Sequence, residues 1–92
     1  GLYERFLNKF LSDPTFGMVT DAFKAGDAQL ALTATHTFKG LTANLGLTKL
    51  YNISSEMVSL IRDGDYGAAA GTFPDLKAAY DEICGILKKG LL

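Results

Sequence analysis

Apolar residues recur at helical spacing along nearly the whole chain, and the interruptions between the periodic segments are short. The interruptions consist of residues that end one helix and begin the next: Asp13-Pro14, Gly26-Asp27 and Asp63-Gly64-Asp65. No segment needs a strand to explain its pattern. The sequence therefore predicts an all-α fold with short connections.

The first part of the pattern predicts two short helices. Apolar residues between positions 2 and 10 indicate a short N-terminal helix. Asp13 is a typical N-cap residue, and Pro14 suits the first helical position, where its fixed φ is helical and its missing N–H has no partner to lose. The second helix carries Phe16, Val19 and Phe23 on one face, and it is expected to end at Gly26.

The rest of the pattern predicts helices over residues 27–46 and 48–63. The inward face of the latter helix is a mainly apolar stripe with two flanking residues: Leu47, Leu50, Ser54, Met57 and Ile61, with Tyr51 and Val58 beside them. Because Pro74 interrupts the last segment, we expect a short helix from Asp65, a break near Phe73 and a longer helix beyond it.

Short connections favour antiparallel packing of neighbouring helices. We therefore expect an up-down antiparallel four-helix bundle with a short extra N-terminal helix packed across one end. A chain of 92 residues has room for one hydrophobic core, so residues 1–92 should form a single domain.

Composition excludes several classes of function. A formal net charge of -1, without any run of Lys or Arg, argues against nucleic acid or an anionic membrane surface as the main partner. One cysteine and one histidine cannot form an internal disulfide or a structural zinc site. No stretch approaches the roughly 18 apolar residues of a membrane span. We expect a cytoplasmic protein that holds no metal and acts on a protein partner or a small ligand.

The only histidine, His36, falls within the helix predicted over residues 27–46. At about 100° per residue, the apolar stripe of this helix spans about 80°: Ala34, Phe38, Leu41 and Leu45. Counted from Leu30, His36 lies at about 240°, nearly opposite the middle of the stripe. We therefore expect the imidazole to face solvent.

Two neighbours of His36 point to a function for the ring. Gly40 lies one turn after His36 in a helix interior, where glycine costs about 1 kcal/mol relative to alanine. Because a side chain at this position would crowd the imidazole, glycine leaves the ring open to a partner's active site. Lys39 is close enough on the helix surface to reach a group attached to the ring.

An exposed imidazole beside one cation is a sufficient minimum for carrying a phosphoryl group. The neutral ring is available near pH 7 because its unperturbed pKa is about 6.5. Phosphoryl transfer depends mainly on alignment and on neutralising the charge of the phosphoryl oxygens. An incidental surface histidine beside a lysine is also common, and the residues by themselves leave both interpretations open.

Four residues near His36 are candidates for docking a partner: Gln29, Leu32, Ala43 and Asn44. Leu32 and Ala43 extend a partly apolar patch around the ring, which is typical of a docking surface. Gln29 and Asn44 are polar, and ordinary surface roles are the alternative for both.

The run His36-Thr37-Phe38-Lys39-Gly40, followed by Gly46, resembles the signature of histidine-containing phosphotransfer (HPt) domains. In that signature His-x-x-Lys-Gly is followed by a glycine six residues later. The helix order and the segment Phe73-Pro74-Asp75-Leu76 are also similar to the family's helical hairpin and C-terminal helix, so the resemblance covers about the whole chain. Thr35 departs from the alanine of many members, without affecting the acceptor role.

The resemblance implies a monomeric phosphocarrier of a two-component phosphorelay. His36 would accept a phosphoryl group from a receiver-domain aspartate of a hybrid sensor histidine kinase and pass it to a response regulator. Lys39 would stabilise the bound phosphoryl group, and Gly40 would keep the ring accessible. No kinase activity and no cofactor are implied, and the sequence has no Gly-rich phosphate loop near His36.

Two other interpretations compete with phosphotransfer. A helical adaptor would only dock other proteins through the face that carries Leu32 and Ala43. A histidine-based enzyme is the weaker alternative, because no carboxylate lies within one helical turn of His36 to orient the ring.

Overall fold

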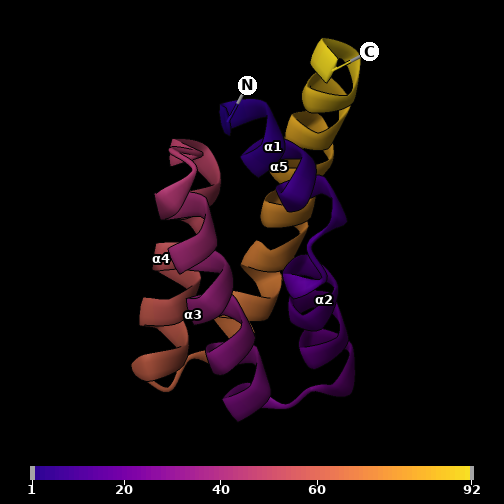
Figure 1. Ribbon diagram of the computed structural model, residues 1–92. Coiled ribbons are helices and arrows are strands. Elements are labelled where there is room, and N and C mark those ends of the chain that lie inside the picture. Colours follow the sequence, from indigo (N-terminus) through magenta and orange to yellow (C-terminus); the bar gives the residue numbers. More distant parts are fainter. Residues whose placement is uncertain (1, 92) are drawn as a thin grey trace.

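Five helices account for almost all of the residues described by the computed structural model, which gives the backbone of residues 2–91 and the side chains of residues 4–5 and 8–89. They are α1 (Leu2–Ser12), α2 (Thr15–Ala25), α3 (Ala28–Asn44), α4 (Thr48–Arg62) and α5 (Tyr66–Leu91) (Figure 1). No strand occurs within residues 2–91. The predicted all-α class is confirmed.

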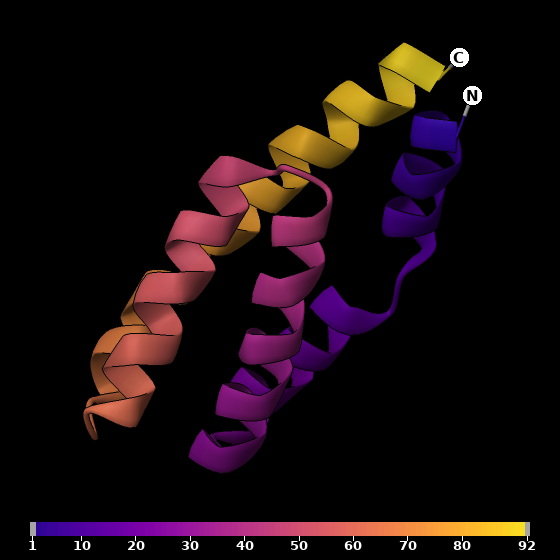
Figure 2. The ribbon, with the colours of Figure 1, turned by 60° about the vertical axis from the view of Figure 1, so that its left-hand side comes forward.

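Four of these helices, α2 to α5, pack against one another around a common core. α3 lies between α2 and α4, α4 packs on α5, and α1 contacts α5 (Figure 2). Side chains connect α2 with α5. The ring of Phe16 stacks on that of Tyr80 with 3.9 Å between the centroids, and the Tyr66 hydroxyl donates to the Phe23 carbonyl at 3.3 Å.

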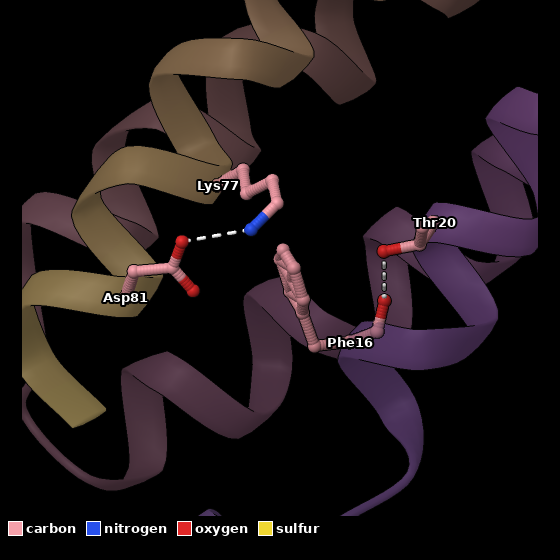
Figure 3. Close-up of polar contacts among 4 residues, drawn as sticks. All are labelled: Phe16, Thr20, Lys77 and Asp81. Carbon is pink, nitrogen blue, oxygen red and sulfur yellow. Dashed lines mark hydrogen bonds and ion pairs between the residues drawn. The ribbon is translucent and has the colours of Figure 1, made fainter. Parts of the chain in front are cut away.

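Apart from the hydrogen bond between Tyr66 and Phe23, aromatic rings make the described side-chain contacts between α2 and α5. Figure 3 shows Lys77 paired with Asp81 at 2.7 Å on α5, and the Thr20 hydroxyl donating to the Phe16 carbonyl at 3.1 Å on α2. Each of these bonds lies within one helix, so neither joins the two helices. The buried Phe16 ring makes that connection.

Aromatic rings from α1, α2, α3 and α5 meet at Phe38, which is 0% exposed. The centroid of the Phe38 ring lies 5.5 Å from that of Phe16, 6.0 Å from Tyr80 and 6.2 Å from Phe10. Such tilted arrangements are favourable for aromatic pairs and add to the burial of apolar area. Phe38 therefore occupies the centre of the core.

The inward stripe predicted for residues 48–63 is confirmed. Its buried members, including one predicted to flank it, are Leu50, Ser54, Met57, Val58 and Ile61. Leu47 and Tyr51 are half-buried at the edge of the same face. The hydroxyl of Ser54 is buried without a hydrogen-bond partner.

The burial of Tyr80 changes the chemistry of its phenol. Burial raises the pKa of Tyr80 to about 12, and a side-chain hydrogen bond with Cys84 and the nearby charges act in the same direction. Tyr80 therefore stays neutral well into the alkaline range and serves as a core ring.

Helix ends occur at the predicted glycine and aspartate residues. Three glycines with positive φ end α2, α3 and α4: Gly26 (68°), Gly46 (69°) and Gly64 (85°). Asp27 caps α3 by accepting the N–H of Leu30 at 3.0 Å, and Asp65 accepts the N–H of Ala68 at 3.1 Å at the start of α5. These caps satisfy amides that lack a partner within the helix.

The boundaries differ slightly from the prediction. α2 begins at Thr15, so Pro14 precedes the helix instead of occupying its first position. The carboxylate of Asp13 still accepts the N–H of Thr15 at 2.8 Å, which is the capping bond expected of it. α3 ends at Asn44, short of the predicted residue 46.

The break predicted near Phe73 is wrong, because α5 is one continuous helix with Pro74 in its interior. Proline cannot donate to the carbonyl one turn earlier, and its ring crowds that carbonyl. The residues on either side of this position, Ala69 and Leu76, are 0% exposed in the same core, whereas Pro74 faces solvent. Packing of α5 against the core therefore outweighs the helix-breaking tendency of Pro74.

Replacing Pro74 with alanine should stabilise the protein. The variant regains a backbone hydrogen bond within α5 and loses the steric conflict, so its free energy of unfolding should rise by about 1–3 kcal/mol. Urea denaturation followed by circular dichroism measures the change. Pro14→Ala is the matched control, because Pro14 lies outside a helix interior and should give no such gain. A less stable Pro74→Ala variant would contradict a continuous α5.

Candidate functional site

His36 lies on the exposed face of α3, as predicted. The buried residues of this helix are on the other side: Ala31, Ala34, Thr35, Phe38 and Thr42. Within the part of the chain that the structure describes, the imidazole forms no hydrogen bond and no ion pair. Both ring nitrogens are therefore available to a partner or a reagent.

The core face of α3 is wider than the predicted stripe and is rotated from it. Phe38, as predicted, is buried, but Leu30, the origin of the count, is 55% exposed. Thr35 and Thr42 are 0% exposed, although the apolar pattern did not include them. The Thr42 hydroxyl donates to the Lys39 carbonyl at 2.9 Å, whereas that of Thr35 has no partner. This rotation moves the core face toward His36 and away from Gly40, and both residues remain exposed.

Gly40 is exposed one turn after His36, and the fold does not require a glycine there. A Cβ at this position would meet nothing within 4 Å outside the backbone of its own helix. The same is true of Gly17, Gly71 and Gly85, so free space is not unique to Gly40. What distinguishes Gly40 is its position one turn after His36, although a Cβ there would still lie more than 4 Å from the imidazole, so only a longer side chain could crowd the ring.

Lys39 is half-buried at the boundary between α3 and α4. Its ammonium lies over the ring of Tyr51 on α4, with Nζ 5.7 Å from the ring centroid, which is within the range of a cation–π interaction. From the sequence, Tyr51 was expected only beside the core stripe of its helix. Its contact with Lys39 depends on the register between two helices, for which the sequence pattern carries no signal.

The four residues proposed to dock a partner are not equivalent. Gln29, Ala43 and Asn44 are exposed, whereas Leu32 is half-buried and packs against the core. Ala43 lines a shallow hollow of about 200 Å³ that also includes Tyr51. Asn44 lines a different hollow, of about 290 Å³, between α1 and α3. The structure thus brings Ala43 close to Tyr51 but turns Asn44 toward α1.

Two other classes of site are not found in the part of the chain that the structure describes. No three or more His, Cys, Asp or Glu residues gather there in a way that would hold a metal ion. None of the described helices combines the length and the apolar character needed to cross a membrane.

Comparison with known proteins adds no relative. No protein-family model, no curated protein and no solved structure matches the chain. An exposed imidazole without a carboxylate partner can act as a nucleophile, and the flexible Lys39 supplies a cation on the same helix.

Replacing Gly40 with alanine should stabilise the fold by about 1 kcal/mol, because alanine is the better helix former and its methyl group meets no neighbour. Denaturant unfolding measures the gain. Gly71→Ala, at another exposed helical glycine, should behave alike, while Gly46→Ala should lose stability because its φ is 69°. A destabilised Gly40→Ala variant would show that the fold itself needs this glycine.

Proposed function

We propose that the chain is a histidine phosphotransfer protein of a two-component phosphorelay. His36 accepts a phosphoryl group from a receiver-domain aspartate of a hybrid sensor histidine kinase and passes it to a response regulator. The observation that carries the proposal is the only histidine of the chain, which is exposed on α3 and has no partner among the described residues, with Gly40 one turn away. The resemblance of this segment to the HPt signature supports the same conclusion.

The transfer needs little from this chain beyond a positioned nucleophile. One nitrogen of the neutral His36 ring attacks phosphorus with its lone pair, the P–O bond to the aspartate breaks, and the aspartate leaves as a carboxylate. The other ring nitrogen can release its proton to water. Lys39 neutralises part of the phosphoryl charge, and a metal ion would come from the receiver domain.

The proposal also covers the arrangement of the helices, the cellular compartment and the oligomeric state. The short connections between α2, α3, α4 and α5 support an up-down antiparallel arrangement of these helices. A net charge of -1 and the lone cysteine support a cytoplasmic monomer whose partners are proteins rather than nucleic acid or membrane. The chain acts as a carrier and has no kinase activity of its own.

A second candidate function is a helical adaptor without phosphotransfer. The hollow between α2 and α3 supports it, because its volume is about 380 Å³ and its lining includes Met18 and Leu30. These side chains are 54% and 55% exposed and line the same hollow, and apolar side chains that gather in this way are typical of a docking surface.

Replacing His36 with glutamine separates the two functions. Incubation with phosphorylated receiver proteins should label the wild-type chain with acid-labile, alkali-stable phosphate, and His36→Gln should remain unlabelled while still binding the receiver. Gel autoradiography and mass spectrometry measure the labelling. An adaptor would keep its signalling output in His36→Gln cells, whereas a carrier would lose it. Absence of labelling by every receiver of the source organism would contradict phosphotransfer.

Replacing Gly40 with leucine should block transfer without unfolding the protein. The added side chain has free space around the helix but lies beside the imidazole, so the transfer rate should fall by more than about tenfold. Stopped-flow transfer assays and circular dichroism measure both properties. Gly71→Leu is the matched control, and it should transfer at the wild-type rate. Normal transfer by Gly40→Leu would contradict the role given to this glycine.

A further inference from the structure

The ammonium of Lys39 has a partner on the neighbouring helix rather than on His36. A helical side chain leaves the backbone toward the N-terminus of its helix, and for Lys39 that is the direction of His36. The ammonium nevertheless lies over the Tyr51 ring, 5.7 Å from its centroid.

Tyr51 belongs to α4 and lies next to the C-terminal end of α3. Its ring lines the hollow of about 200 Å³ together with residues of the C-terminal end of α3 and the turn into α4: Thr42, Ala43, Gly46, Leu47 and Thr48. All of these follow Lys39 in the chain, whereas His36 precedes it by about one turn of α3. The ring that the ammonium contacts therefore lies near the C-terminal end of α3, whereas His36 lies in the middle of that helix.

The Tyr51 ring and a phosphoryl group on His36 would bind the Lys39 ammonium with different strengths. The face of an aromatic ring attracts a cation modestly, and the half-buried Tyr51 is held in place between α3 and α4. A phosphoryl group offers charged oxygens that form much stronger hydrogen bonds with an ammonium. Phosphorylation of His36 would therefore give the same ammonium a second and stronger partner.

We propose that Tyr51 is a positioning residue that holds the Lys39 ammonium while His36 is unmodified and releases it to the phosphoryl group when His36 is phosphorylated. The inference rests on the proposed function and deepens it, because it makes the retention of the phosphoryl group depend on a residue of α4. The strength of the ring contact sets how readily Lys39 is released.

The wild-type chain can be phosphorylated without any partner, because potassium phosphoramidate modifies exposed histidines and His36 is the only histidine. The ring nitrogen forms a bond to phosphorus, the P–N bond of the reagent breaks, and ammonia leaves with the proton that the ring gives up. This reaction makes the test independent of kinases and receivers.

Proton NMR of the Lys39 ε-methylene group, assigned by its loss in Lys39→Arg, reports where the side chain lies. The Tyr51 ring current should shift this resonance upfield in the unmodified chain, and phosphorylation of His36 should move it to the position of a free lysine. Tyr51→Phe should reproduce both spectra, since it keeps the ring. An unshifted resonance in the unmodified wild type, or an upfield shift that survives phosphorylation, overturns the proposal.

The half-life of phosphohistidine gives a second readout. Tyr51→Leu removes the competing ring, so it should lengthen the half-life by about two- to fivefold. Tyr51→Phe keeps the ring and should match the wild type. In a Lys39→Ala background, Tyr51→Leu should have no effect on the half-life. An effect that persists without Lys39 overturns the proposal. If Tyr51→Leu does not fold, the wild-type NMR spectra before and after phosphorylation still test the proposal. Failure of every receiver to label the chain would refute the proposed function and leave these measurements unchanged.

Discussion

The packing of Phe38 against the rings of Phe10, Phe16 and Tyr80 fixes how α3 is rotated about its own axis. Because Phe38 and His36 belong to one rigid helix, the burial of one ring determines the exposure of the other. A helix that turned by one residue would lose the aromatic contacts and bring the imidazole toward a neighbouring helix. The orientation of the candidate nucleophile is therefore a consequence of core packing.

The same rotation separates the residues that stabilise the fold from those that serve the site. The buried face of α3 supplies the contacts with the neighbouring helices, while His36, Gly40 and Ala43 make no core contact. Lys39 is intermediate, because its stem is half-buried and its ammonium rests on Tyr51. The chain can thus vary the chemistry of the exposed face with little change in the free energy of unfolding.

Features set by local periodicity and turn chemistry were predictable from the sequence. The exposure of His36, the buried stripe of α4 and the glycines that end three helices follow from helical spacing and from the conformations that glycine tolerates. The prediction of a helix break near Phe73 was wrong, because buried residues of α5 on both sides of Pro74 keep the helix continuous. The contact between Lys39 and Tyr51 was missed because it depends on the register of α4 against α3, which no pattern along one helix reveals.

Thr35 is a residue that the core of this fold does not favour. Its hydroxyl is buried on the core face of α3, the helix that also carries His36, and it has no hydrogen-bond partner among the described residues, a state that costs about 1–3 kcal/mol. Alanine at this position would remove the unpaired oxygen and is also the better helix former. Replacement of Thr35 by alanine is therefore a change that the fold itself would favour.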